Sequence, residues 1–150
     1  MDEHNFEKYT NYWAKSRLVA KVCAYFKPKS VLDVGCGEGK TVKLLRDMGI
    51  DAYGIDTGEM GKYDKEHCIY GDARYIPFKD KRFDIVVSND FFEHIVEEEI
   101  DQVYNEMKRV GKKVIARISL KEKDNHFTVK PISWWKEKLP GCHFIGKDWR

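Results

Sequence analysis

A glycine-rich segment in the first third of the chain has residue types and spacing that suit a ligand-binding loop. Glycine occupies alternate positions at Gly35, Gly37 and Gly39, directly after the apolar run 30–34. Glycine lets the backbone turn sharply and lets a ligand approach without interference from a Cβ atom. Asp56, at the end of the next predicted strand, can accept hydrogen bonds from both hydroxyls of a ribose. The glycine loop together with Asp56 predicts a site for a nucleoside-containing cofactor.

The spacing of the loop also discriminates between nucleoside cofactors. A dinucleotide fingerprint, G-x-G-x-x-G, would need its third glycine where the chain has Lys40. Asp33 stands just before the first glycine, where its carboxylate would repel a pyrophosphate. A carboxylate there suits S-adenosylmethionine, which carries an ammonium and a sulfonium and has no phosphate. The chain also lacks the G-x-x-x-x-G-K-[ST] pattern of a P-loop.

The segment Asp33–Gly39 resembles the cofactor loop of class I, Rossmann-like S-adenosylmethionine-dependent methyltransferases. Three later segments agree with this family in type and order: Gly54–Asp56, Gly71–Ala73 and Phe92–Ile95. The resemblance covers residues 30–119. It implies S-adenosylmethionine as the cofactor and transfer of its methyl group, by in-line displacement, to an acceptor.

The resemblance also implies a set of cofactor-binding residues. Asp33 and the glycine loop would hold the methionine end, Asp56 the ribose, and Asp72 the adenine amino group. Asn89 and Asp90 would line the pocket near the sulfonium. The residues expected to bind the cofactor in the core are Asp33, Gly35, Cys36, Gly37, Gly39, Asp56, Asp72, Ala73 and Asn89.

Aromatic and basic side chains outside the glycine loop are weaker candidates. Tyr9 and Trp13 lie on a predicted N-terminal helix that could close over the cofactor, because an aromatic face suits a sulfonium. Asp90, His94 and His126 are candidate general bases, although a good leaving group makes a base optional. The four cysteines are widely spaced, and we expect no metal site.

Helix and strand patterns alternate along the chain. We expect helices at 3–27 (in one or two pieces), 40–48, 97–109 and 131–139. Strands are expected at 30–34, 52–55, 68–70, 83–88, 113–119 and 142–145. This order predicts an α/β fold with one doubly wound, mainly parallel sheet, order 3-2-1-4-5 plus a C-terminal strand, and helices on both faces. It is a shortened form of the class I methyltransferase fold.

Length and composition agree with one folded domain. The chain has 150 residues, 42% hydrophobic and 35% charged, which excludes a disordered chain. We expect a helical lid at 1–29, a cofactor-binding core at 30–119 and an acceptor-side segment at 120–150. No apolar run is long enough to span a membrane, and the sparse cysteines favour a reduced, cytoplasmic compartment.

The methyl acceptor is poorly marked in the sequence. It could be a small molecule, a protein or RNA, and the lysine-rich stretch 108–138 would suit an acidic acceptor. Methyltransferases of DNA amino groups carry [DNS]-P-P-[YFW] after the fourth strand, and both prolines are missing from residues 89–92. That subclass is therefore disfavoured.

Two further features leave alternatives open. Residues 57–70 leave little room for a full helix, so the sheet near the second and third strands would be thinly covered. A second copy or a partner could cover it. The chain could also be a non-catalytic cofactor-binding module that acts through a partner, whereas a nicotinamide-dependent reductase is disfavoured by the glycine spacing.

Overall fold

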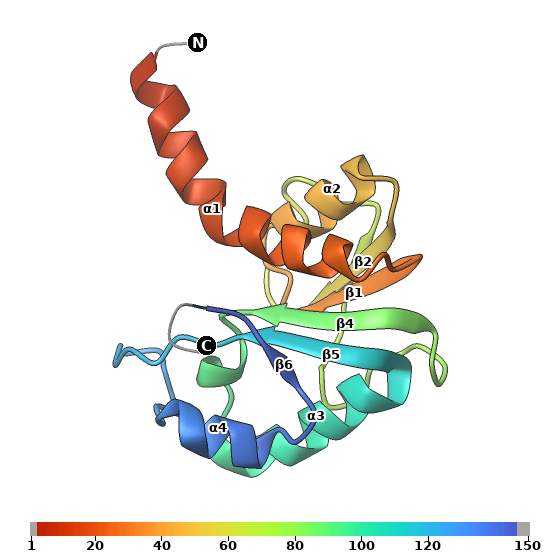
Figure 1. Cartoon of the computed structure of the whole chain (residues 1–150), viewed down its shortest axis with the longest axis vertical. Helices are drawn as coiled ribbons and strands as arrows, with labels where there is room; N and C mark the ends of the chain where they lie inside the picture. The colour runs from red at the N-terminus through yellow and green to blue at the C-terminus, as the bar shows by residue number, and fades with distance from the viewer. Residues whose placement is uncertain (1–2, 147–150) are drawn as a thin grey trace.

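Six strands form a single sheet that lies between two layers of helices (Figure 1). The computed structural model describes residues 3–146, with side chains from Trp13 onward. The strands are β1 (Ser30–Val34), β2 (Asp51–Asp56), β3 (Cys68–Tyr70), β4 (Phe83–Asn89), β5 (Gly111–Arg117) and β6 (His143–Phe144). Every pairing is parallel and the order is β3-β2-β1-β4-β5-β6. The predicted order is confirmed.

Helices cover both faces of this sheet, as predicted (Figure 1). On one face lie α1 (Glu3–Tyr25) and α2 (Lys40–Asp47), and on the other α3 (Glu97–Val110) and α4 (Ile132–Lys138). A short 3-10 helix, η1 (Phe92–His94), lies between β4 and α3. The N-terminal stretch is one continuous helix, and its first turns extend beyond the sheet.

Each face of the sheet has its own hydrophobic core. On the α1–α2 side the core includes Val31 of β1, and on the α3–α4 side it includes Leu32 and Val34. Because side chains alternate along a strand, Asp33 shares the α1 side with Val31. The strand thus places a carboxylate under α1, inside the fold.

The segment 57–67 contains no helix or strand, so the expectation that a full helix does not fit here is confirmed. The segment instead packs on the glycine loop. The N–H of Gly61 donates to the carbonyl of Gly37, and the N–H of Tyr63 donates to the carbonyl of Glu38, both at 3.0 Å. This connection therefore forms part of the wall around the loop.

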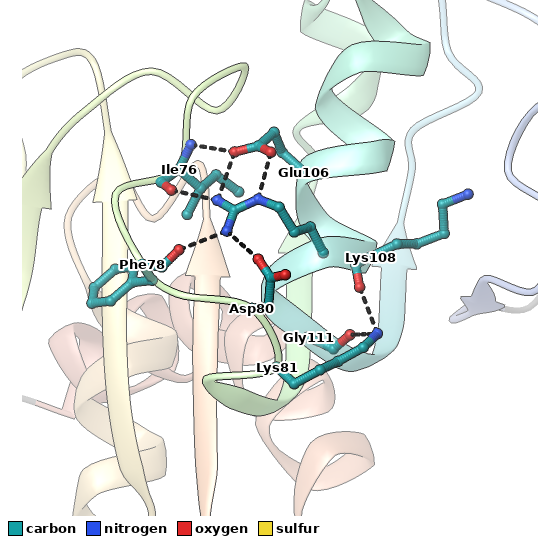
Figure 2. A network of polar contacts seen from close by, with 8 residues as sticks. Ile76, Phe78, Asp80, Lys81, Glu106, Lys108 and Gly111 are labelled. Atoms are coloured by element: carbon teal, nitrogen blue, oxygen red, sulfur yellow. Dashed lines mark hydrogen bonds and ion pairs between the residues drawn. The ribbon is translucent and has the colours of Figure 1, made fainter.

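The end of α3 is fastened to the connection between β3 and β4 (Figure 2). The guanidinium of Arg109 donates to the Glu106 carboxylate and to the Asp80 carboxylate. It also donates to the backbone carbonyls of Ile76 and Phe78, each at 2.8 Å. This network fixes the 76–80 segment against α3, directly after the segment that lines the candidate site.

Among the helices that the structure describes, none is long and apolar enough to cross a lipid bilayer.

Candidate functional site

The glycine loop lies at the carboxyl edge of the sheet, between β1 and α2. Gly35, Gly37 and Gly39 all have positive φ angles, of 77°, 50° and 81°. L-residues with side chains rarely adopt such angles, which explains the repeated glycine. The N–H groups of Gly35 and Cys36 both donate to the carbonyl of Ile55, at 2.8 and 3.1 Å. The loop is thereby anchored on the end of β2.

Asp56 holds this loop from the end of β2. Its two carboxylate oxygens accept hydrogen bonds from the N–H groups of Gly37 and Gly58, each at 2.9 Å. Each carboxylate oxygen has a second lone pair, so the side chain can still accept bonds from a ligand. The sequence predicts contact with a ribose, and the structure adds a role in ordering the loop.

A cavity of about 290 Å³ lies beside the loop, under α1. Asp33 and Asn89 line it, together with Ser16 of α1 and residues of the glycine loop. Asp33 is only 3% exposed, and neither its Oδ1 nor Oδ1 of Asn89 accepts a hydrogen bond from a residue that the structure describes. Two buried oxygens without donors suit a ligand that brings N–H groups and positive charge.

Burial raises the pKa of Asp33 well above its usual range, and nearby Cys68 and Asp56 add to the rise. A buried carboxylate without a partner is unfavourable in its charged form. An ammonium bound beside it would favour the charged form. The electrostatics of the cavity therefore fit the methionine end of S-adenosylmethionine, which carries such a group.

A second cavity, of about 400 Å³, shares Gly35 with the first as a lining residue. It is lined by Asp56, Asp72 and Ala73 on one side, and by Asp90 and His94 on the other. The structure thus brings together the residues expected at the ribose and adenine with two of the candidate bases. An extended ligand that passes Gly35 could occupy both cavities.

Asp72 already has a partner within the chain. Its carboxylate accepts hydrogen bonds from the guanidinium of Arg74, the shortest at 2.7 Å, and from the Arg74 N–H at 2.9 Å. These bonds lower the pKa of Asp72. An adenine amino group would share this carboxylate with Arg74, a feature that the sequence analysis did not anticipate.

Asp90 is also paired within the chain. Its carboxylate forms ion pairs with Lys15 of α1, at 3.2 Å, and with Arg117 at the end of β5. Asp90 therefore links α1 to the carboxyl edge of the sheet. With both oxygens occupied, its carboxylate is less available as a general base than the sequence alone suggests.

Of the two aromatic residues expected to close over the cofactor, the structure describes the side chain of Trp13. The ring of Trp13 packs edge-on against Tyr63, with 4.8 Å between centroids, beside the glycine loop. Tyr9 lies outside the residues whose side chains are described. Contact of either ring with a cofactor stays a prediction.

The two candidate histidines, far apart in sequence, lie side by side. The rings of His94 and His126 meet edge-on with centroids 4.7 Å apart. Glu93, which the sequence analysis did not single out, lies next to them and is fully buried. Burial raises the pKa of Glu93 to about 7. The only sequence signal for this group was the adjacent Glu-His pair after the fourth strand.

A comparison with protein families agrees with this geometry. A family model described as "Methyltransferase domain" matches residues 32–114. The chain belongs to this methyltransferase family. The resemblance to class I S-adenosylmethionine-dependent methyltransferases is therefore confirmed, and so is the Rossmann-like fold of this methyltransferase domain.

The names of two relatives mention different methyl acceptors. The domain is 34% identical over 98 residues to norajmaline N-methyltransferase of Rauvolfia serpentina. It is 37% identical over 98 residues to a probable tocopherol O-methyltransferase of Oryza sativa. Each match covers 57% of this chain, but only 33% and 26% of the respective relative. The chain thus matches about a third or less of these proteins.

A solved structure shows the same fold. The crystal structure of a SAM-dependent methyltransferase from Archaeoglobus fulgidus aligns with a TM-score of 0.59 at 26% identity. The alignment covers 75% of this chain and 55% of that one.

Proposed function

We propose that this methyltransferase domain binds S-adenosylmethionine across the two cavities and transfers its methyl group to an acceptor. The observation that carries the proposal is the burial of the Asp33 carboxylate. This carboxylate is buried at the switch point of the sheet, beside a loop of three glycines with positive φ. One of its oxygens accepts no hydrogen bond within the described part of the chain. A phosphate-bearing cofactor would be repelled there, whereas an ammonium would be bound.

Each part of the site then has a task. Asp33 and Asn89 would accept hydrogen bonds from the ammonium. Asp56 would hold the ribose while it keeps the glycine loop in place through Gly37 and Gly58. Asp72 and Ala73 would bind the adenine in the larger cavity.

S-adenosylmethionine supplies a methyl group on a sulfonium, which is already a good leaving group. The protein then needs chiefly to orient the acceptor in line with the bond that breaks, an effect that can supply about 7–11 kcal/mol. The ion pairs of Asp90 with Lys15 and Arg117 would fix the wall of the cavity on the acceptor side. No general base is required by this scheme.

The acceptor can be sought with S-adenosylmethionine labelled in its methyl group. The domain would be incubated with pools of RNA, proteins and small molecules. We expect label to appear in one pool with the wild-type chain and in none with Asp33→Asn. Cofactor binding without transfer to any pool would favour the alternative function, a non-catalytic module that acts through a partner.

A further inference from the structure

Glu93, His94 and His126 form a cluster of possible metal ligands at one end of the larger cavity. Glu93 and His94 belong to η1, which follows β4, whereas His126 lies in the connection after β5. One ligand atom from each residue lies within 4.8 Å of the other two. Because β4 and β5 are adjacent and parallel, the fold brings these two connections to the same edge of the sheet.

Both histidines are oriented by backbone carbonyls. Nδ1 of His94 lies 2.8 Å from the carbonyl oxygen of Asn125, and Nδ1 of His126 lies 2.6 Å from that of Lys121. A carbonyl oxygen can only accept, so Nδ1 carries the hydrogen in each ring. Nε2 of each neutral ring then keeps its lone pair. Metal-binding histidines are typically oriented in this way, with the other ring nitrogen bonded to a carbonyl or carboxylate.

Glu93 supplies an observation that is independent of the histidines. The side chain is fully buried, and among the described residues neither carboxylate oxygen has a hydrogen-bond partner of good geometry, although the backbone N–H groups of Glu93 and Ser119 lie close enough to lower its pKa. Burying a carboxylate without a partner is strongly unfavourable, and a bound cation would compensate for it. The described residues give Glu93 no cationic side chain as an ion-pair partner.

We propose that Glu93, His94 and His126 bind a divalent first-row transition-metal ion. Two imidazole nitrogens and one carboxylate are the protein ligands of several catalytic Zn²⁺ sites, whereas Mg²⁺ and Ca²⁺ prefer oxygen ligands alone. Bonds of about 2.0–2.2 Å place the ligands of a tetrahedral ion roughly 3.4 Å apart. Ligand atoms that lie within 4.8 Å of one another would therefore need only a small approach to bind one ion.

Three protein ligands leave at least one coordination position open. His94 lines the same cavity as Asp56 and Asp90, so an open position can face that cavity. This step rests on the proposed function: the methyl acceptor would approach the open position from the cavity. No metal site was expected from the sequence, because that expectation rested on the spacing of the cysteines, which take no part here. Glu93 and His94 are adjacent, and His126 lies more than thirty residues further along the chain.

Calorimetric titration with Zn²⁺ tests the site directly. After treatment with a chelator, we expect the wild-type chain to bind one Zn²⁺ ion that His126→Asn weakens at least tenfold. Glu93→Gln, which keeps the shape of the side chain, should weaken it similarly. His143→Asn is the matched control, because His143 is exposed on β6 and belongs to no such cluster. Loss of a ligand should weaken binding at least as much as an outer-shell change, for which 10–100-fold is typical.

Titration of the same metal-free protein with S-adenosylmethionine separates this proposal from the proposed function. Zn²⁺ binding that persists unchanged in His126→Asn, or no Zn²⁺ binding by the wild type, would overturn the metal site even if the cofactor binds. Zn²⁺ binding with the expected variant effects would uphold the site even if the cofactor does not bind. Co²⁺ titration gives a second readout, since a visible absorption band would appear with the wild type and not with His126→Asn.

Discussion

At the scale of single residues, Asp33 carries much of the chemistry of the site. Its side chain faces α1 rather than solvent, and none of the described side chains or backbone groups donates a hydrogen bond to its Oδ1. The ligand-free protein therefore holds a carboxylate whose charged form is unfavourable. An ammonium in the adjoining cavity would favour the charged form. Replacing Asp33 by a neutral residue should therefore stabilise the ligand-free chain and weaken binding of the cofactor.

We predict that Asp33→Asn stabilises the ligand-free chain at pH 7 and abolishes its stabilisation by S-adenosylmethionine. Replacing a buried carboxyl group whose charged form is unfavourable should raise the free energy of unfolding by roughly 1–3 kcal/mol. Urea unfolding with and without the cofactor would measure both effects. A variant that is less stable than the wild type and still gains stability from the cofactor would contradict this role.

The pKa of Asp33 also predicts a pH dependence. Since burial raises this pKa in the folded state, the folded chain retains a proton that the unfolded chain loses from about pH 4 upward. The contribution of Asp33 to the free energy of unfolding is therefore favourable at low pH and declines as pH rises toward the folded pKa. Subtracting the pH profile of Asp33→Asn from that of the wild type should isolate this decline, and parallel profiles would argue against it.

Gly37 tests the glycine loop at the same scale. We predict that Gly37→Val abolishes cofactor binding while the fold survives, since a Cβ at Gly37 would meet no protein atom within 4 Å. Gly49→Val is the matched control, because Gly49 also has a positive φ and open space but lies beyond α2. Both variants should lose about 1–2 kcal/mol from backbone strain. Calorimetry with S-adenosylmethionine should show binding only for Gly49→Val; equal binding by both would remove Gly37 from the site.

Part of the site was predictable from single residues. The glycine spacing and Asp33 pointed to the cofactor because local sequence sets the loop conformation. The pairing of Asp72 with Arg74 and of Asp90 with Arg117 was not anticipated, since side-chain partners depend on packing. The predicted pairing of β4 with β5 brings the two connections to the same edge of the sheet, but the meeting of His94 with His126 also depends on the paths of these connections, which the strand order does not fix.

At the scale of elements, most boundaries followed from apolar periodicity. β1 and β3 match the predicted ranges, whereas β5 begins at Gly111, earlier than Lys113. The difference arises because α3 ends at Val110 and passes into β5 without a connecting loop. A helical pattern followed by a strand pattern predicts a turn between the two. Here Gly111, the first residue of β5, directly follows the last residue of α3.

The network around Arg109 gives a prediction at this scale. Arg109→Ala would remove hydrogen bonds to Glu106, Asp80 and two backbone carbonyls, and should lower the free energy of unfolding by about 2–3 kcal/mol. Lys112→Ala is the control, because the Lys112–Asp84 ion pair is exposed and should contribute less than about 1 kcal/mol. Denaturant unfolding compares the two, and equal losses would show that the network adds little.

At the scale of the whole molecule, opposite charges are paired across the fold. Lys130 and Lys138, in the lysine-rich stretch 108–138, form ion pairs with Glu97 and Asp101 of α3. The same two lysines lie over the ring of Trp134. This pairing reduces the basic character that the sequence suggested, and an acidic acceptor on this face stays a prediction.

The expected partner at the thin part of the sheet also stays a prediction. Segment 57–67 covers part of the α1 side, where Gly61 lies against Cys68 of β3. Tyr70 at the end of β3 and nearby Tyr75 remain largely exposed. These two rings mark the surface on which a second copy or a partner would be sought.

The melting temperature tests most directly whether the two cavities bind S-adenosylmethionine rather than a dinucleotide. A ligand that binds only the folded state adds about 2.7 kcal/mol at a hundred times its dissociation constant. S-adenosylmethionine or its demethylated product should therefore raise the melting temperature, whereas NAD and NADP should not. Asp56→Ala should reduce the shift, and Asp56→Asn should fall between, because the amide keeps one acceptor oxygen. A shift with NAD and none with S-adenosylmethionine would contradict the account.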